Sequence, residues 1–358
     1  MKTHTYALVG CGNIAQRYAD TLKAYPQLKF AGAYDIVPQR TKDFCTKNGG
    51  KVYASLEDVL LDPDVEIILN LTIQHVHAEV IRKCLLAGKH VHTEKPMAMT
   101  YPEAAGLVQL ADELGLRLSS SPIVFLGEAH QTAFKMIRED KIGRIPLVYA
   151  EVNWGRIEGW HPNPVPFYQV GVLFDVAVYP LTVLTALFGP AKRVHAHGKV
   201  LLPKRKTTTG QHYYLDYPDY ILSHIEFANG TILRLTADFF VNSVNTDQKP
   251  GIEFHGETGS IILTDWHNFD SGLKYGAFEH EMKEVPLLKE PYKGCEWARS
   301  LVELASAIDE NRPHRAQGAQ AAHVIEIMGA IQTSMRNDGA AVEVFSGFNT
   351  PAPLDWAK

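Results

Sequence analysis

The chain has 358 residues, of which 46% are hydrophobic and 21% are charged, so it is long and apolar enough for two globular domains. This balance excludes wholesale disorder and fibrous or collagen-like classes. The 35 Lys and Arg residues are outnumbered by 40 Asp and Glu, and the resulting formal net charge of −5 predicts that nucleic acid is not a partner.

Strand and helix patterns alternate along the chain as far as Ser120. Short apolar runs bounded by turn residues predict strands at 5–9, 28–34, 65–71, 90–93 and 117–120. Helical patterns are predicted at 14–25, 78–87 and 102–114, and Ser55-Leu56-Glu57-Asp58 has the form of a capping box that opens a short helix. This alternation predicts an α/β domain whose parallel sheet is covered by helices on both faces.

The pattern changes after a predicted helix at 128–138. Long alternating strands follow at 148–154, 195–200, 221–227, 231–237, 252–255 and 260–264. They are interrupted by an apolar helix at 172–188 and followed by amphipathic helices at 297–310 and 320–337. This half is predicted to be an α+β domain with a large, mostly antiparallel open sheet. A boundary near Pro122 divides the chain into domains 1–122 and 123–358.

A glycine turn directly follows the first strand and opens the first helix. In Gly10-Cys11-Gly12-Asn13-Ile14-Ala15 the first glycine allows a tight turn, and the second lets backbone N–H groups approach a pyrophosphate. The small third residue, Ala15, lets helix and strand pack closely, with the phosphates at the positive end of the helix. The first domain is therefore predicted to be a Rossmann domain that binds a dinucleotide through Gly10, Gly12, Asn13 and Ile14.

An acidic residue closes the second strand, about 20 residues beyond the glycine turn. A carboxylate at Asp35 would accept a hydrogen bond from the adenosine ribose 2′-hydroxyl and repel a 2′-phosphate, which favours NAD over NADP. Arg40 is close enough in sequence to keep NADP open as the alternative.

Glu94-Lys95-Pro96 follows the strand at 90–93, at the end of the strand where open α/β sheets place their ligands. With this motif in place, the chain resembles the glucose-fructose oxidoreductase, inositol dehydrogenase and rhizopine-catabolism family (Gfo/Idh/MocA) over nearly its whole length. The matching pieces are Gly10–Ala15, Thr72–His77, Gly88–Val91 with Glu94–Pro96, Asp175–Tyr179 and Gly256–Gly259.

The resemblance implies roles for several residues. Lys95 would serve the catalytic site, next to a Lys–Pro bond that is commonly cis in the family. The second domain would carry the substrate pocket and, through its open sheet, the interface of a homodimer or homotetramer. The remaining cofactor-binding candidates lie after the third and fourth main strands: Leu71, Thr72, Gln74, His77, Glu94 and Lys95.

The chain departs from the family pattern at three places. Thr72-Ile73-Gln74 stands where the family usually has Thr-Pro-Asn, although Thr72 and Gln74 still offer polar groups to the cofactor. Gln169-Val170-Gly171-Val172 stands where the family usually has a glycine-rich run before the aspartate. Tyr179 stands where many members have histidine, and this resembles the branch that contains glucose-fructose oxidoreductase and dihydrodiol dehydrogenase.

Tyr179, Lys95 and Asp175 form a chemically sensible catalytic set. Hydride transfer at nicotinamide needs a proton donor or acceptor on the carbinol oxygen. A free tyrosine has a pKa near 10, and a nearby lysine ammonium lowers the pKa by favouring the phenolate. Asp175 and Tyr179 are four residues apart, so on an α-helix they share one face, from which Asp175 could bind a sugar hydroxyl or tune Lys95.

The segment upstream of this helix reads as a substrate loop. Arg156, Trp160 and His161 combine aromatic and hydrogen-bonding groups, which suit the apolar C–H faces and hydroxyl edges of a polyol. The histidine pairs 75/77, 90/92 and 195/197 have strand spacing, but no carboxylate or cysteine cluster completes a ligand set, so no metal site is predicted. A serine hydrolase is also not predicted, because the chain has no G-x-S-x-G turn.

These observations lead to one functional hypothesis with two alternatives. The hypothesis is an NAD(P)-dependent oxidoreductase acting on a secondary alcohol or carbonyl of a sugar, inositol or related polyol. The alternatives are a glycosidase that retains NAD with no net redox change, and a non-catalytic sugar or nucleotide sensor of the same fold.

Cysteine usage and the N-terminal segment indicate the compartment. The four cysteines are far apart and show no paired spacing, which suits a reducing environment. The N-terminal segment lacks the pattern of a signal peptide or a membrane span. The expectation is a soluble, cytoplasmic protein without a membrane partner, in which the basic cluster Lys204-Arg205-Lys206 is a solvated loop.

Overall fold

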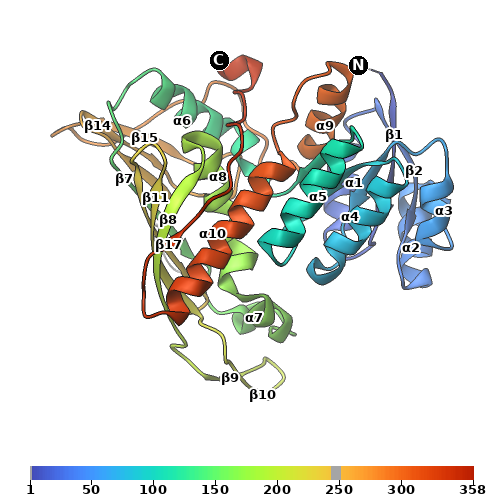
Figure 1. Ribbon diagram of the computed structural model, residues 1–358, viewed down its shortest axis with the longest axis horizontal. Helices are drawn as coiled ribbons and strands as arrows, with labels where there is room; N and C mark the ends of the chain where they lie inside the picture. Colours follow the sequence, from blue (N-terminus) through green and yellow to red (C-terminus); the bar gives the residue numbers. More distant parts are fainter. Residues whose placement is uncertain (1, 243–250) are drawn as a thin grey trace. The chain divides into compact units, whose positions relative to one another are not determined.

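The computed structural model describes residues 2–242 and 251–358. Contacts divide the chain into two compact units, Met1–Ile123 with Glu296–Ile325, and Val124–Cys295 with Glu326–Lys358. Each unit is built around its own sheet (Figure 1).

The first unit contains a six-stranded sheet with the order β3-β2-β1-β4-β5-β6. All of its strand pairs are parallel, as predicted. Because the order reverses between β1 and β4, the crevice at their carboxyl ends is where open α/β sheets bind ligands. The strands are β1 (His4–Val9), β2 (Leu28–Tyr34), β3 (Lys51–Val52), β4 (Ile67–Asn70), β5 (His90–Thr93) and β6 (Leu118–Ser120).

Helices connect and cover these strands. The predicted cap is present, since the Ser55 hydroxyl accepts a hydrogen bond from the Asp58 N–H at 3.0 Å. Sequence reasoning missed α2, which begins at a proline in its first turn. The helical segments are α1 (Ala15–Leu22), α2 (Pro38–Asn48), α3 (Leu56–Leu61), η1 (Gln74–Val76), α4 (His77–Leu86), α5 (Tyr101–Glu113) and α9 (Arg299–Asp309).

The segment Glu296–Ile325 groups with the first unit, whereas the sequence-based division assigned it to the second. The physical reason is the apolar face of α9. Its Leu301, Leu304 and Ala305 are fully buried in one core with Leu8 of β1 and Tyr18 of α1. A boundary read along the chain cannot detect such a return, because the whole of Val124–Cys295 lies in sequence between the helix and the first part of its unit.

The second unit contains a nine-stranded sheet with the order β16-β15-β14-β13-β7-β12-β11-β8-β17. Every neighbouring pair is antiparallel except β7 with β12, so the predicted mostly antiparallel sheet is confirmed. The strands are β7 (Leu147–Asn153), β8 (Ala191–Lys199), β11 (Tyr220–Phe227), β12 (Ile232–Asp238), β13 (Ile252–His255), β14 (Gly259–Leu263), β15 (Leu273–Ala277), β16 (Lys283–Glu284) and β17 (Val342–Glu343).

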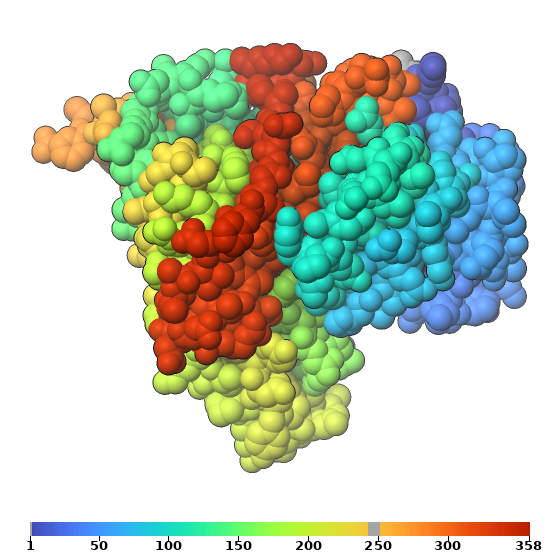
Figure 2. Space-filling view, in the orientation of Figure 1, coloured from blue at the N-terminus to red at the C-terminus, as the bar shows by residue number. Residues whose placement is uncertain are grey.

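One face of this sheet is covered by helices. The Phe188 ring of α8 contacts Phe227 of β11 and Phe254 of β13, and Ser334 of α10 accepts a hydrogen bond from the Ala196 N–H of β8. A separate hairpin of β9 (Lys204–Lys206) and β10 (His212–Tyr214) lies at one end of this unit (Figures 1 and 2). The helical segments are η2 (Val124–Leu126), α6 (Glu128–Arg138), η3 (Ile157–Gly159), α7 (Val165–Val172), the π-helix η4 (Leu173–Ala177), α8 (Val178–Phe188) and η5 (Asp355–Ala357). The helix α10 (Gly318–Arg336) begins in the segment that groups with the first unit, and its residues from Glu326 onward group with the second.

The apolar helix predicted at 172–188 is longer and less regular than expected. It begins at Val165, has a non-helical Gly171 (φ 79°, ψ 156°), and passes through a π-helical turn before α8. Among the described residues this is the one helical run long and apolar enough to span a membrane, and 78% of its most apolar window is buried. Buried core helices of globular proteins pass the same test, so the run is weak evidence for a membrane span.

Candidate functional site

The glycine turn has the backbone geometry that close contact requires. Gly10 has a φ of +99°, and a Cβ there would lie 2.6 Å from the carbonyl carbon and oxygen of Leu71. A Cβ at Gly12, in contrast, would meet no atom within 4 Å, so this side of the turn is open. Ala15 is fully buried at the start of α1. The turn therefore joins the ends of β1 and β4 through Gly10 and offers a free approach at Gly12.

Asp35 is buried at the end of β2 and holds the glycine turn. Its Oδ2 accepts a hydrogen bond from the Cys11 N–H at 2.8 Å, and its Oδ1 accepts one from the Val37 N–H at 2.8 Å. The Arg40 guanidinium lies 4.0 Å from Oδ1 and is mostly exposed. A carboxylate oxygen has two lone pairs, so each oxygen of Asp35 can still accept from a ligand hydroxyl.

The turn after β4 carries the next group of candidates. Asn70 Oδ1 accepts hydrogen bonds from both the N–H and the hydroxyl of Thr72, at 3.3 and 2.7 Å. Thr72 and Gln74 are half-buried, and Ile73 between them is exposed. The buried Leu71 backbone packs directly on Gly10. This turn is thus fixed by its own side chains and by the glycine turn.

His77 bridges two backbone segments. It is fully buried, with Nε2 at 2.9 Å from the Thr72 carbonyl oxygen and Nδ1 at 2.8 Å from the Pro96 carbonyl oxygen. Burial lowers the pKa of His77, although its carbonyl partners oppose this shift. Both ring nitrogens face backbone oxygens, so His77 ties the turn after β4 to the Lys95–Pro96 segment. The prediction that it also contacts the cofactor stays a prediction.

Glu94-Lys95-Pro96 follows β5, and the Lys95–Pro96 bond is cis. The Glu94 carboxylate is buried and accepts hydrogen bonds from the Tyr18 hydroxyl at 2.6 Å and from the Lys95 N–H at 3.2 Å. Lys95 is half-buried. Sequence reasoning did not identify Tyr18, whose only signal was its place on the helix that follows the glycine turn.

These residues fit a dinucleotide. An open glycine turn, a helix N-terminus and a carboxylate at the end of β2 are the donor and acceptor set that recognises a pyrophosphate and an adenosine ribose. The observation that carries the fit is the space at Gly12, which a side chain would fill.

The second unit places Asp175 and Tyr179 on different helical segments. Asp175 is half-buried in the π-helix η4, and Tyr179 is mostly buried in the first turn of α8. The predicted shared face assumed regular α-helical spacing, which a π-turn alters. The Tyr179 ring lies 5.0 Å from the His267 ring and 5.3 Å from the Trp266 ring, centroid to centroid. Sequence reasoning missed both neighbours, which lie in the loop after β14.

The residues predicted for the substrate loop fall into two groups. Trp160 is 53% exposed and contacts His161 and Phe167, with ring centroids 5.5 Å away in each case. Arg156 instead stacks on the Phe240 ring at 4.8 Å and donates a hydrogen bond to the Phe240 carbonyl. Arg156 and Trp160 are therefore exposed and His161 is half-buried, and the three candidates do not form a single cluster.

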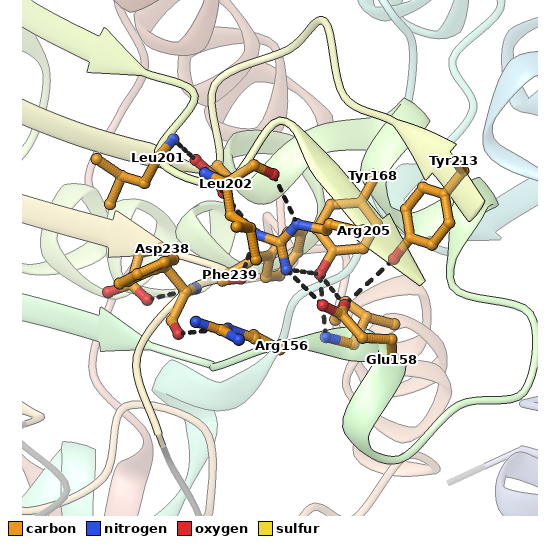
Figure 3. Close-up of polar contacts among 12 residues, drawn as sticks. Arg156, Glu158, Tyr168, Leu201, Leu202, Arg205, Tyr213, Asp238 and Phe239 are labelled. Carbon is orange, nitrogen blue, oxygen red and sulfur yellow. Dashed lines mark hydrogen bonds and ion pairs between the residues drawn. The ribbon is translucent and has the colours of Figure 1, made fainter. Parts of the chain in front are cut away.

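The basic cluster is not a solvated loop, and this prediction was wrong for its central residue. Lys204 and Lys206 are exposed, but Arg205 is 2% exposed, because alternate residues of a strand point to opposite faces. All five guanidinium N–H groups have acceptors (Figure 3): the Leu202 and Phe239 carbonyls, Glu158 at 2.8 Å, the Tyr168 hydroxyl at 2.7 Å and Asp219 at 2.5 Å.

This Arg205 cluster supports the loop that carries the substrate candidates. Glu158 lies in η3 between Arg156 and Trp160, and it also accepts a hydrogen bond from Tyr168 of α7. Burial alone would raise the pKa of Glu158, but hydrogen bonds from Tyr168 and Arg205 hold the pKa below its usual value. In residues 2–242 and 251–358, no three His, Cys, Asp or Glu side chains are grouped to hold a metal ion.

Comparison with known proteins agrees with this geometry. Residues 4–121 match a family model described as "Oxidoreductase family, NAD-binding Rossmann fold", and residues 130–262 match the GFO/IDH/MocA C-terminal domain. The chain is 26% identical to 1,5-anhydro-D-fructose reductase of Ensifer adhaerens over 263 residues, covering 72% of this chain and 74% of the relative.

Two further similarities extend over most of the chain. It is 26% identical to trans-1,2-dihydrobenzene-1,2-diol dehydrogenase of Sus scrofa over 294 residues, covering 80% of this chain and 81% of the relative. A solved levoglucosan dehydrogenase, in complex with NADH and L-sorbose, superposes with a TM-score of 0.83 at 21% identity, covering 97% of this chain and 100% of the other. With its two halves matched by the two domain models, the chain belongs to the Gfo/Idh/MocA family of NAD-binding oxidoreductases.

Proposed function

We propose that this protein is a dehydrogenase or reductase that acts on a secondary alcohol or carbonyl of a sugar, inositol or related polyol. Lys95 and Tyr179 handle the proton, and Asp175 orients the substrate. The dinucleotide is held by Gly10, Gly12, Asn13, Ile14, Asp35, Arg40, Leu71, Thr72, Gln74, His77, Glu94 and Lys95. Arg156, Trp160 and His161 complete the proposed substrate contacts.

One chain of contacts in the first unit carries this proposal. Gly10 packs on the Leu71 carbonyl, the adjacent Thr72 carbonyl faces His77, and His77 faces the Pro96 carbonyl beside Lys95. A dinucleotide-binding turn and a lysine are thereby held in one rigid arrangement at the carboxyl edge of the sheet. Fixed geometry of this kind is what positioning a reactive group requires.

The chemistry divides between cofactor and protein. A bound nicotinamide dinucleotide supplies or accepts the hydride. The Tyr179 phenol gives a proton to, or takes one from, the substrate oxygen, and the Lys95 ammonium stabilises the negative charge on that oxygen. Aromatic surface at Trp160, which is 53% exposed, suits the C–H faces of a sugar. Relatives named for 1,5-anhydro-D-fructose, levoglucosan and a dihydrobenzenediol support a ring substrate with hydroxyl groups.

We propose NAD as the preferred cofactor and NADP as the alternative. The buried Asp35 carboxylate lies where a 2′-phosphate would be repelled, and Arg40 is the one cation near it that the structure places within 4.0 Å among the described residues.

The experiment that tests the function is absorbance of reduced nicotinamide. Purified protein is mixed with NAD or NADP and a pooled panel of sugars and polyols, which is then split to find the substrate. We expect reduced cofactor to accumulate. The proposal would be contradicted if no member of the panel caused reduction of NAD or NADP, and none caused oxidation of NADH or NADPH.

A matched pair of lysine variants tests the catalytic assignment. Lys95→Ala should lower kcat about 100-fold or more, because proton transfer and charge stabilisation are lost. Lys47→Ala, an exposed change in the same unit, should leave kcat unchanged. Near-normal turnover of Lys95→Ala would refute its role.

The two alternatives predict different results in the same assay. A glycosidase that retains its dinucleotide would copurify with NAD and release sugar from glycosides without accumulating NADH. A sensor would bind NAD and turn over no member of the panel. The retention of Lys95, Asp175 and Tyr179 favours the dehydrogenase over the sensor.

We propose that the open face of the nine-stranded sheet joins two copies of this chain. Residues of β7 alternate between buried and half-exposed, and Tyr149 on the half-exposed face stacks with Arg234 at 3.8 Å. Half-exposed Leu147 and Ile262 add apolar surface to this face. Light scattering after size-exclusion chromatography should give a dimer or tetramer, and Tyr149→Glu should shift it toward monomer.

A cytoplasmic location without membrane or nucleic-acid partners completes the proposal.

A further inference from the structure

A buried chain of polar side chains lies behind Glu94 in the first unit. The Tyr18 hydroxyl of α1 is 2.6 Å from Glu94 Oε1 and 3.1 Å from the Ser121 hydroxyl. The Ser121 hydroxyl is 3.3 Å from His92 Nε2, and His92 Nδ1 is 2.9 Å from the Ser119 hydroxyl. All five side chains are buried, with exposures of 7% or less.

One arrangement of protons satisfies each of these contacts. Burial lowers the pKa of His92 to about 3, so at neutral pH the ring is neutral and has one N–H. Ser119 then donates to Nδ1, the Nε2–H donates to Ser121, Ser121 donates to the Tyr18 oxygen, and Tyr18 donates to Glu94. The direction is set by the Glu94 carboxylate, which only accepts.

We propose that Tyr18 is a positioning residue that holds the Glu94 carboxylate and, through it, the backbone of Lys95. Glu94 uses one oxygen for the Tyr18 hydroxyl and the other for the Lys95 N–H. The shorter contact, at 2.6 Å, is the one to Tyr18. Because α1 begins directly after the glycine turn, the same helix that faces the dinucleotide also fixes the segment that carries Lys95. This inference rests on the proposed function of Lys95.

Tyr18→Phe removes one hydroxyl and keeps the ring. The ring contacts with Trp297 and His92, at 5.6 and 6.3 Å, therefore remain. Tyr53→Phe is the matched control, because Tyr53 is buried in the same unit and donates to the Asp62 carboxylate at 2.7 Å without any part in the site. Tyr18→Phe should lower kcat about tenfold, with the KM for NAD within about twofold. Tyr53→Phe should leave both constants unchanged.

A double-mutant cycle separates positioning from packing. If Tyr18 acts through Glu94, then Tyr18→Phe should cause no further loss of kcat in a Glu94→Ala background. If the two losses multiply instead, Tyr18 acts independently of Glu94, and the proposal is overturned.

Hydrogen exchange gives a readout that needs no substrate. In Tyr18→Phe, the peptide that contains the Lys95 N–H should exchange faster, because the carboxylate that accepts from it is released. The same peptide in Tyr53→Phe should exchange as in the unmodified protein. Unchanged exchange in Tyr18→Phe would refute the positioning role.

The outcomes distinguish this inference from the function on which it rests. If Lys95→Ala turns over normally, the proposed function fails, whatever Tyr18 does. If Lys95→Ala is impaired and Tyr18→Phe has normal kcat, only the positioning role fails.

Discussion

At the scale of single residues, the glycine turn shows why two glycines in one motif have different tasks. The fold requires a glycine at position 10. Its positive φ is unfavourable for other residues, and the nearby Leu71 backbone leaves no room for a side chain. Gly12 faces open space, so the fold itself does not need a glycine there. The proposed dinucleotide, whose pyrophosphate would approach the backbone there, would explain a glycine at this second position.

Alanine substitutions should separate these two tasks. Gly10→Ala should lower the free energy of unfolding by about 2 kcal/mol or more, because the Cβ is strained and collides with backbone. Gly12→Ala should change stability by less than about 1 kcal/mol and weaken NAD binding about tenfold or more. Urea unfolding and titration of NADH fluorescence measure the two effects. Equal loss of stability in both variants would contradict this division.

Asp35 is expected to set cofactor preference at the same turn. In Asp35→Ala, the Cys11 and Val37 N–H groups lose their acceptor, and the negative charge that opposes a 2′-phosphate is removed. The ratio of the Kd for NADP to the Kd for NAD should fall about tenfold or more. Asp43→Ala, an exposed change on α2, is the control and should leave the ratio unchanged. Parallel titrations with both cofactors provide the measurement.

At the scale of elements, the β9–β10 hairpin is attached to its unit through Arg205 of β9 and Tyr213 of β10. The Tyr213 hydroxyl donates a hydrogen bond to Glu158 at 3.3 Å, and its ring lies 5.9 Å from the Tyr168 ring, centroid to centroid. Arg205 on β9 reaches η3, α7, the segment before β11 and the end of β12. The exposed Lys204 and Lys206 point away from this contact. A short hairpin with little core of its own thus obtains its position from a buried ion cluster.

Removing that arginine should destabilise the second unit. Arg205→Met leaves the buried Asp219 carboxylate and the half-buried Glu158 carboxylate without their cation, so the free energy of unfolding should fall by about 3 kcal/mol. Arg205→Lys keeps the positive charge but loses the planar set of guanidinium donors. Its free energy of unfolding should therefore lie between those of the unmodified protein and Arg205→Met. Lys204→Met should change stability by less than about 0.5 kcal/mol. Chemical unfolding measures all three, and an unaffected Arg205→Met protein would show that the cluster does not anchor the hairpin.

At the scale of the whole molecule, the half-buried His90 and the buried His92 and His130 affect stability. Burial lowers the pKa of His90 to about 4, of His92 to about 3 and of His130 to about 4. In the unfolded chain these side chains bind a proton below about pH 6.5. Between about pH 6.5 and the lowered pKa values of the folded protein, unfolding takes up protons. The contribution of these neutral histidines to stability is therefore complete above about pH 6.5 and is lost as the pH falls toward 4.

Acid should therefore destabilise this protein before its carboxylates titrate. Each such histidine contributes up to about 1.4 kcal/mol of lost stability per pH unit in this range. His92→Gln should reduce the loss between pH 6.5 and 5 by about 2 kcal/mol at most. His280 is exposed, so His280→Gln should leave the loss of stability between pH 6.5 and 5 unchanged. Urea unfolding at a series of pH values is the measurement. If the free energy of unfolding had the same dependence on pH in His92→Gln and in the unmodified protein, His92 would not be a source of the acid destabilisation.

Local sequence patterns determined most of the elements and the glycine turn. The predicted bounds of β2, β5, α6 and β13 coincide with those of the structure. Each is a short segment with clear periodicity and turn residues at its ends, so local physics is sufficient. The glycine turn and Asp35 were also readable, because their spacing follows from one β-α-β unit.

Only the tertiary structure decided the remaining features, because each depends on residues far apart in the sequence. The place of α9 in the first core, the burial of Arg205 and the contact of Tyr18 with Glu94 all join distant segments. The π-turn at Asp175 alters a local spacing that the sequence does not signal. The sequence by itself therefore determined the elements and the glycine turn, and the tertiary structure decided which side chains hold Glu94 and the loop at η3, since long-range packing selects those partners.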